Sequence, residues 1–380
     1  MKKKYIVLSI ITLVLLITFV TSFNYFKTSN NYVEDSVNNQ TKITKGISMN
    51  LEQTAGAGDY KIVTQSNWPT EGYKFNAELS KCENGGEISW DDTKKAVIVS
   101  GNLSDKCYVY FDIYQLTLAE YIKSQYTGTQ GDNALYYHNS TLTNGAGDNS
   151  YRYAGASDSV NNYICLGSDT TTCPDANLFR IIGVFGDKTK VIRAKSVGYQ
   201  QWHTSADNTW SSSSLNAYLN GTYLTSLGTI AEKIATTTWK VGGGSGSNIS
   251  ASVPKTAYKN EVGSSASTTI IDKKIGLMYV SDYGFAASPS AWTKTLGDYD
   301  GTDANGTSIK TINWMYMGYN EWTISRHSDN TNSAFFVNST GNVLGSNVRS
   351  DAGVFPAFNL ESSVKYVSGS GSMSDPVRIK

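Results

Sequence analysis

Hard oxygen ligands gather at one point of the sequence, in the segment DYDGTDANG. Asp298, Asp300, Asp303 and Asn305 are closely spaced there, and carboxylate and amide oxygens are the ligands that calcium prefers. The segment does not follow the EF-hand pattern, because Thr302 takes that motif's fifth position and no glutamate closes the loop. A polar turn that uses Asp, Asn and Gly for their backbone geometry is the alternative. We therefore predict no metal site, and keep these four residues as a weak calcium candidate.

Residues for acid–base or nucleophilic chemistry are sparse. The three histidines, His138, His203 and His327, form no His-x-x-x-His pair. No Gly-x-Ser-x-Gly elbow, P-loop or Gly-x-Gly-x-x-Gly motif is found either. The sequence thus predicts neither catalysis nor a cofactor.

A late hairpin offers binding chemistry instead. In SAFFVNSTGNVLGSNV the alternation places Phe335 and Val337 on one face, and Phe336 and Asn338 on the other. The turn ends at Gly341, which supplies a positive φ. One face should pack inward and the other should present amides, hydroxyls, arginine and an aromatic ring, a composition typical of binding loops. An ordinary exposed β face is the alternative.

Two structural regions must position these residues. From residue 51 to about 113, short alternating segments such as YKFNAEL, GEISWDD and CYVYFDI predict a small β-sandwich. From 114 to 380 we expect one α+β domain with a capped helix at 116–126, since Thr117 and Glu120 make a capping box.

Further elements of this second region follow from local patterns. NLFRIIGVFGDKTKVIRAKSV predicts a hairpin that turns at Gly186-Asp187, and SSSSLNAYLNGTYLTSL predicts a helix capped by a serine. KIGLMYVSDYGFA predicts a buried strand. GVFPAFNL predicts a closing strand that Pro356 restricts to an edge or a bulge.

The bulk composition excludes one class of partner. The 380 residues carry 32 basic and 32 acidic side chains, and no concentrated basic surface is visible, so we predict no nucleic-acid binding. Charged residues make up only 17%, below the usual quarter or so. Abundant Asn, Ser, Thr, Gly and Tyr are common in exported proteins, although an AT-rich genome favours several of the same residues.

The N-terminus carries the strongest targeting signal. Three lysines precede an uncharged run from Tyr5 to Phe23, close to the roughly 20 residues that cross a bilayer as a helix. We predict that residues 1–23 form a single-pass membrane anchor, with the N-terminus cytoplasmic, residues 24–50 a stalk and the remainder extracellular. A signal peptide cleaved after Ser22, which would release a secreted protein, is the alternative.

Cysteine usage agrees with export. Four cysteines allow three pairings, of which the local one, Cys82 with Cys107 and Cys165 with Cys173, is the most economical. Disulfides persist in an oxidising compartment. Reduced buried thiols are the alternative, whereas a zinc site lacks Cys-x-x-Cys spacing and a nearby histidine.

Several segments together resemble a known family. IGLMYVSDYGFAASPSAW, NWMYMGYNEWTISR, SAFFVNSTGNV, GVFPAFNL and VSGSGSMSDPVRI are similar to a C-type-lectin-like domain of unknown function that occurs in exported proteins of gut Firmicutes and Mollicutes-like bacteria. The resemblance covers most of residues 114–380. It implies a fold related to formylglycine-generating enzymes and to retroelement-diversified receptors. The segment CENGGEISWDDTKKAVIVSGNLSDKCYVYFD resembles a small β module that often precedes the domain.

The chain departs from this family at instructive positions. Phe355 follows Gly353-Val354 where relatives commonly have arginine, and Trp322 to Arg326 replace a Trp-Leu-Arg-Ser-Pro strand. A buried arginine anchor is therefore absent or supplied from elsewhere. No cysteine follows Cys173, so formylglycine-generating activity is not implied, and the Glu-Pro-Asn and Trp-Asn-Asp calcium ligands of lectins are missing.

These observations predict a surface-anchored binding or adhesion protein of a bacterium, which contacts an extracellular glycan, peptide or protein. An exported enzyme on the related fold and a structural envelope protein are the alternatives. The candidate ligand-binding residues are Trp322, Arg326, His327, Asn330, Asn332, Phe336, Asn338, Asn347 and Arg349.

Overall fold

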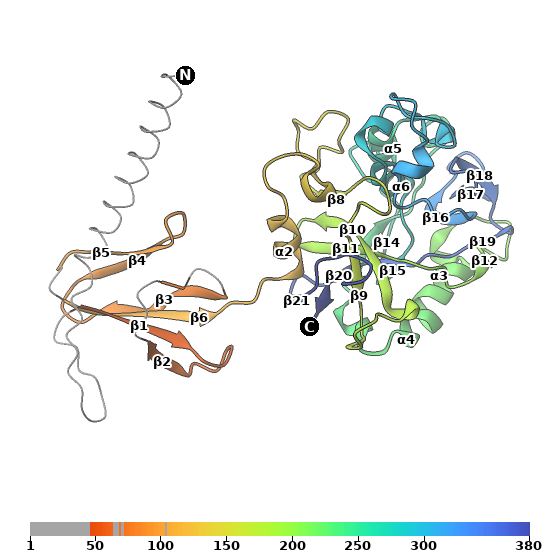
Figure 1. Ribbon diagram of the computed structural model, residues 1–380. Helices are drawn as coiled ribbons and strands as arrows, with labels where there is room; N and C mark the ends of the chain where they lie inside the picture. The colour runs from red at the N-terminus through yellow and green to blue at the C-terminus, as the bar shows by residue number, and fades with distance from the viewer. Residues whose placement is uncertain (1–45, 64–67, 70–71, 103–104) are drawn as a thin grey trace, which may run out of the picture. The chain divides into compact units, whose positions relative to one another are not determined.

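The computed structural model describes residues 46–63, 68–69, 72–102 and 105–380 (Figure 1). The chain divides into two compact units, Met1–Gln115 and Leu116–Lys380. The predicted membrane anchor and most of the predicted stalk lie outside the described residues. Among the described residues, no helix combines the length and the apolar character needed to cross a bilayer.

The first unit is an all-β module. Its four-stranded sheet has the order β2-β1-β6-β3, and β4 and β5 form a separate hairpin. The strands are β1 (Gly46–Glu52), β2 (Tyr60–Val63), β3 (Tyr73–Cys82), β4 (Glu87–Asp91), β5 (Ala96–Ser100) and β6 (Lys106–Ile113).

Aromatic side chains join the sheet to the hairpin of this module. The ring of Phe111 on β6 lies 5.3 Å from that of Trp90 on β4 and 5.9 Å from that of Phe75 on β3. The core is small, and the Cys82–Cys107 disulfide joins β3 to β6 where these two residues face each other in register. A staple of this kind stabilises a module too small for a large core.

One strand of this module starts earlier than the sequence suggests. β1 begins at Gly46, inside the segment assigned to the stalk, and pairs in parallel with β6. The alternation of apolar and polar residues that marks a strand is not visible in β1, because some of its buried side chains are polar. Asn50 donates to the Val109 carbonyl at 3.3 Å, and the Glu52 carboxylate accepts from the Ile113 amide at 2.9 Å.

The second unit is mixed α+β and contains more strand than helix. A seven-stranded sheet has the order β15-β20-β11-β10-β8-β7, with β9 also paired to β10, and a five-stranded sheet has the order β12-β19-β16-β17-β18. The strands of the first are β7 (Leu135–Tyr137), β8 (Tyr151–Tyr153), β9 (Tyr163–Cys165), β10 (Leu178–Phe185), β11 (Lys188–Arg193), β15 (Ile275–Gly276) and β20 (Ala357–Leu360). Those of the second are β12 (Tyr199–Gln201), β16 (Glu321–Arg326), β17 (Ser333–Val337), β18 (Val343–Asn347) and β19 (Asp351–Gly353).

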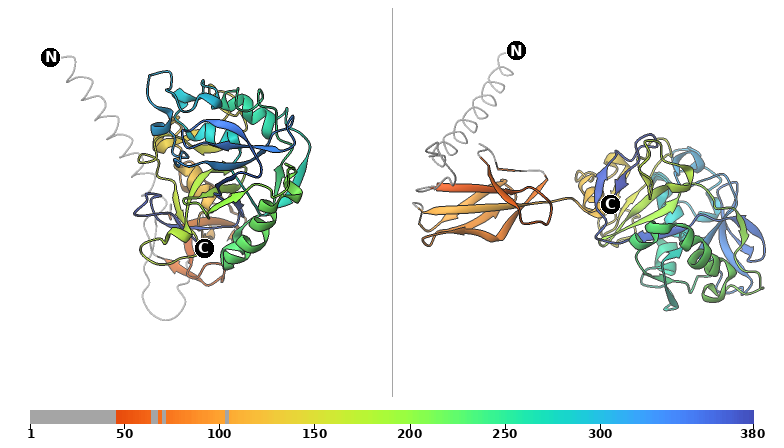
Figure 2. Two further views of the ribbon diagram at one scale, coloured as in Figure 1. Left: turned by 90° about the vertical axis from the view of Figure 1, so that its right-hand side faces the viewer. Right: turned by 90° about the horizontal axis from the view of Figure 1, so that it is seen from below.

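Two ribbons and short helices complete the unit. The ribbons are β13 (Thr237–Lys240) with β14 (Ile270–Lys273), and β21 (Tyr366–Ser368) with β22 (Arg378–Ile379). The helices are α2 (Leu118–Ser124), α3 (Ser214–Tyr218), α4 (Leu224–Ser226), α5 (Pro254–Glu261), α6 (Val280–Ala286) and a π-helical turn (Leu219–Tyr223) between α3 and α4. Figure 2 shows the α3–α4 stretch, in green, along the outside of the unit. Short 3-10 turns cover Asp132–Ala134, Asp175–Asn177, Trp210–Ser212, Gly228–Lys233, Pro289–Ala291, Leu296–Asp298 and Ile309–Ile312.

Locally encoded predictions are confirmed in this unit. Thr117 caps α2 and forms the capping box with Glu120. The β10–β11 hairpin turns at Gly186-Asp187, and Ser213 caps α3. Each signal involves residues within a few positions of one another, so no tertiary contact had to be foreseen.

Two predictions about buried segments are wrong. Residues 274–286 form only the short strand β15 before α6 begins, because Asp282 caps the helix by accepting from the Tyr279 amide at 2.9 Å. An apolar run of this length does not distinguish a buried strand from a buried helix. Residues 353–360 are not one edge strand, because Pro356 separates β19 from β20, and β20 is an interior strand of the other sheet.

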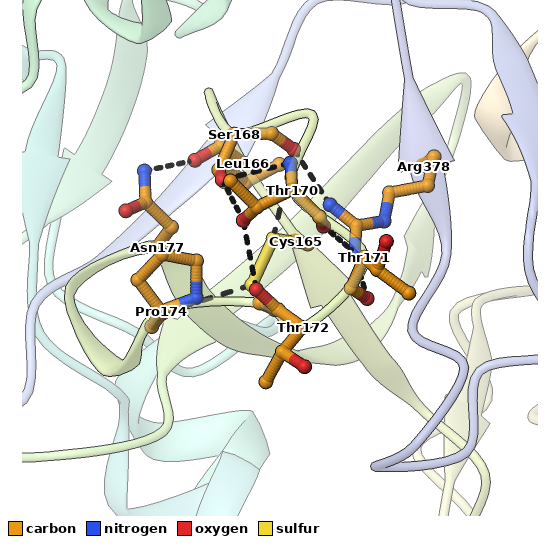
Figure 3. Close-up of a disulfide and its surroundings, with 10 residues drawn as sticks. Cys165, Leu166, Ser168, Thr170, Thr171, Thr172, Pro174, Asn177 and Arg378 are labelled. Carbon is orange, nitrogen blue, oxygen red and sulfur yellow. Dashed lines mark hydrogen bonds between the residues drawn. A yellow bond between two sulfur atoms is a disulfide. The ribbon is translucent and has the colours of Figure 1, made fainter.

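The second predicted disulfide, Cys165–Cys173, is also present and closes a loop after β9. Arg378 on β22 holds this loop by donating to the carbonyl oxygens of Ser168 at 2.6 Å and Thr170 at 2.9 Å (Figure 3). The loop is thus fixed by a covalent bond and by a strand from the far end of the chain.

Candidate ligand-binding site

The predicted late hairpin exists as β17 and β18, with β16 on its other side. Asn338 builds the turn, since its side-chain oxygen accepts from the backbone amides of Thr340 at 3.0 Å and Asn342 at 2.9 Å. Gly341 has the expected positive φ of 99°. The Asn338 side chain therefore holds the turn.

Trp322 lies inside the domain. Its side chain is 1% exposed, and its indole nitrogen donates to the Gln200 carbonyl at 2.9 Å. Phe336, its cross-strand partner, is half-buried with its ring 5.9 Å away. Trp322 therefore packs as part of the core and is not available to a ligand, whereas Phe336 is partly accessible.

Arg326 and His327 are fixed by internal contacts. The Arg326 guanidinium donates to the Gly242 carbonyl at 3.0 Å and to the Asn208 side chain at 3.2 Å. The His327 ring stacks on Phe335, with ring centres 4.9 Å apart, and contacts the Asp329 carboxylate. Both side chains are half-buried, so only part of each lies at the surface of the unit.

Four of the candidates lie at the open end of the hairpin, namely Asn330, Asn332, Asn347 and Arg349. Ser333 and Asn347 face each other there, and the Val348 amide donates to the Asn332 carbonyl at 2.9 Å. Asn330 and Arg349 are exposed beside them. We call His327, Asn330, Asn332, Asn347 and Arg349 the hairpin rim; Asn338 lies at the opposite end of the hairpin.

The calcium candidate forms a polar turn. The Asp303 carboxylate accepts from the amides of Asn305 at 2.9 Å and Thr307 at 2.8 Å, and a hydrogen bond from the Ser290 side chain lowers its pKa. Within the described residues, no group of three or more metal-ligating His, Cys, Asp or Glu side chains comes together. The carboxylate is thus used for backbone geometry.

A second candidate site, which sequence reasoning missed, is built across the seven-stranded sheet. Arg152, Gly183, Lys190 and Asn359 face one another in succession on β8, β10, β11 and β20. An irregularity after Ile181 brings Gly183 into this row. A Cβ at Gly183 would stand 2.1 Å from a backbone oxygen of β8, so only glycine permits this approach.

Aromatic residues wall a pocket over this row. The pocket has a volume of about 180 Å³, and its lining includes Phe185, Trp239, Tyr258 and Tyr279. β13, α5 and α6 supply most of the wall; Figure 1 shows the two helices side by side. We call it the Lys190 pocket.

Hydrogen bonds hold the wall rings in place. Trp239 donates from its indole nitrogen to the Lys273 carbonyl at 3.0 Å, and the Tyr279 hydroxyl donates to the Lys240 carbonyl at 3.1 Å. A pocket that is formed before its ligand arrives loses less entropy on binding.

A chain of charges forms the floor of the pocket. Lys190 Nζ lies 2.5 Å from Asp282 Oδ2, and Arg152 lies 3.5 Å from the other oxygen of the same carboxylate. Arg152 also pairs with Asp148 at 2.7 Å. All but Asp148 are almost fully buried, Lys190 at 5% and Asp282 at 3% exposed. Burial lowers the pKa of Lys190, while Asp282 opposes that shift.

Lys190 retains hydrogen-bonding capacity. An ammonium group has three donors, and among the described residues Asp282 is its one hydrogen-bond partner. Its other neighbours are ring faces, with centres at 4.7 Å for Tyr279 and 5.4 Å for Trp239. Cation–π contacts stabilise the charge without using those donors.

The pocket and the hairpin rim are joined by one segment. β13 continues into Gly244, whose amide donates to the Arg326 carbonyl at 3.1 Å and whose carbonyl accepts from the Ser328 amide at 2.9 Å. Glu261, at the end of α5, accepts from the Ser281 amide at 2.8 Å and from the Ser325 hydroxyl on β16. A ligand in the pocket and a ligand on the rim would therefore contact segments that are hydrogen-bonded to each other.

Two arginines are buried among the described residues of this unit. Arg180 is buried and bonds to Asn162 at 2.6 Å, with its guanidinium 4.6 Å from the ring centre of Trp314. Arg152 is buried as well.

The fold and the two sites define this unit as a mixed α+β domain with a walled pocket and a polar rim. Residues 186–362 match the family model of a domain of unknown function (DUF6273). The expectation of a domain of unknown function in this unit is confirmed to that extent. The match contains Lys190, Trp239, Asp282 and the hairpin rim, and Arg152 precedes it.

No curated protein matches the chain. No solved structure matches it either.

Proposed function

We propose that the chain is a bacterial surface protein whose second unit binds an extracellular glycan, peptide or protein without catalysis. The observation that carries this proposal is the Lys190 pocket: aromatic walls held in place, and a buried ammonium with donors to spare. Pockets that combine apolar walls with a few placed polar groups are the usual form of ligand sites.

The hairpin rim supports the same proposal. Exposed amides and an arginine adapt their hydrogen bonds to a partner, and they stand next to the segment that forms a wall of the pocket. We propose that the rim contacts parts of the ligand that extend beyond the pocket.

Export and anchoring are part of the proposal. The apolar run at residues 5–23, which follows three lysines, supports a membrane helix, and two disulfides suit an oxidising compartment. We further propose a C-type-lectin-like fold for the second unit, on the sequence segments that resemble that family.

Glycan and peptide arrays probed with the full chain, with and without calcium, test the function. We expect binding on at least one array, equal in both conditions, since the Asp303 loop is a polar turn. Silence on both arrays would contradict the proposed binding function. Turnover of an array compound would favour the exported enzyme instead.

A further inference from the structure

The geometry of the Lys190 pocket points to the chemical class of its ligand: we infer that it takes a single six-membered ring that carries a carboxylate. This inference rests on the proposed binding function and adds the class of group that the pocket recognises. Three features of the pocket support it, namely its size, its walls and its charge.

The size limits the occupant to one ring. An apolar cavity of roughly 150 Å³ binds one benzene molecule, so a volume of about 180 Å³ suits one ring of that size. A group of that size is one six-membered ring with its substituents. The rest of a longer glycan or peptide must extend out of the pocket. The hairpin rim is hydrogen-bonded to the segment that follows the β13 wall.

The walls favour a ring over an extended chain. Four aromatic rings line the pocket: Phe185 and Tyr258 are half-buried, whereas Trp239 and Tyr279 are almost fully buried. Flat apolar faces of this kind stack on the face of a sugar or of an aromatic ring. The side-chain nitrogen of Asn359 donates to Thr237 at 3.0 Å, so its oxygen is left as an acceptor for a ring hydroxyl.

The charge favours a carboxylate. Three cationic side chains, Arg152, Lys190 and Lys240, line the pocket, against one anionic side chain, Asp282. Arg152 is partly neutralised by Asp148, which is not part of the lining. The spare donors of Lys190 would meet a ligand carboxylate, and hydrogen bonds between charged groups are stronger than those between neutral ones.

Titration calorimetry at pH 7 with the full chain tests this inference. The probes are sodium glucuronate, its neutral counterpart glucose, and sodium benzoate. We expect glucuronate to bind at least tenfold more tightly than glucose. If benzoate also binds, the ring face and the carboxylate suffice; if it does not, the ring hydroxyls contribute as well. Glucose binding as tightly as glucuronate, or no binding by either carboxylate, would overturn the inference.

Variants locate the effect. Lys190→Met should remove the preference for glucuronate over glucose, whereas Lys195→Met, on an exposed lysine just beyond the same hairpin, should keep it. Because Lys190→Met perturbs a buried ion pair, Thr238→Trp provides a second test. Thr238 is exposed at the pocket, so the indole should block entry without altering the floor, and all probe binding should be lost. Unchanged binding in Thr238→Trp would place the site elsewhere.

The array experiment separates this inference from the proposed function. An array signal combined with no carboxylate preference refutes the ligand class and keeps the binding function. Silent arrays refute the binding function itself.

Discussion

The buried Lys190–Asp282 pair allows a quantitative test of the structure. Asp282→Asn keeps the size of the side chain and an oxygen to cap α6, but removes the counter-charge of Lys190. Breaking a buried ion pair by neutralising one partner costs about 3–5 kcal/mol. For a domain of this size we expect the melting temperature to fall by about 2–4 °C for each kcal/mol.

The reverse change should cost less. In Lys190→Met the Asp282 carboxylate keeps Arg152 at 3.5 Å and the Tyr279 amide at 2.9 Å, so we expect a loss of about 1–2 kcal/mol. Lys195–Asp175 is a matched control with the same 2.5 Å separation, but its side chains are 57% and 64% exposed. Asp175→Asn should therefore cost less than about 1 kcal/mol.

Urea unfolding at pH 7 measures all three variants. Tryptophan fluorescence reports mainly on the second unit, which holds six of the eight tryptophans in its core, namely Trp202, Trp210, Trp239, Trp292, Trp314 and Trp322. Refutation would take one of two forms: Asp282→Asn no more costly than Asp175→Asn, or Lys190→Met more costly than Asp282→Asn.

Three further predictions concern other parts of the fold. Burial raises the pKa of the Glu321 carboxyl in the folded state above the unfolded value of about 4.5. The folded state is therefore most stable below that unfolded value, where the carboxyl is protonated, and it loses stability as the pH rises towards the folded pKa. By urea unfolding, Glu321→Gln should be more stable than wild type at pH 7 and equal to it near pH 4. Gly183→Ala should cost about 3 kcal/mol or more through its backbone clash, against about 1 kcal/mol for Gly186→Ala, where φ is positive but space is open; equal costs by chemical denaturation would count against the strand register. Replacing Cys165 and Cys173 by alanine should cost about 2–3 kcal/mol, measured by thermal unfolding, and an unchanged melting temperature would disprove the role of the loop.

Local patterns predicted many elements of the fold. Thr117 and Glu120 lie three positions apart, and each disulfide joins two cysteines that are consecutive in the order of cysteines along the chain. Such features depend on short-range geometry, which a single sequence displays. β1 was missed because its buried side chains include Asn50 and Glu52, which conceal the alternation.

The Lys190 pocket could not be predicted in the same way. Arg152, Lys190, Asp282 and Asn359 come from distant parts of the chain and meet only through strand register and the placement of α6. Each alone resembles an ordinary polar position. One signal was available: Lys190 directly precedes the apolar Val191 and Ile192 in the hairpin arm, and a charge on a buried arm needs a partner.

Trp322 shows the opposite error. A tryptophan next to a polar loop suggested a stacking platform, yet its side chain packs inside the unit. Alternation along β16 does not reveal the exposed face, because Glu321 to Ser325 are all buried. Whether a face of a sheet is exposed to solvent depends on which other elements of the fold pack against it.

Hydrogen–deuterium exchange of the full chain, with and without a ligand identified on the arrays, tests the central claim most directly. The account predicts slower exchange on binding at Thr237–Lys240 and around Asn330 to Asn332, since these backbone segments border the Lys190 pocket and the hairpin rim. Protection confined to other segments, with these two unchanged by a bound ligand, would contradict it.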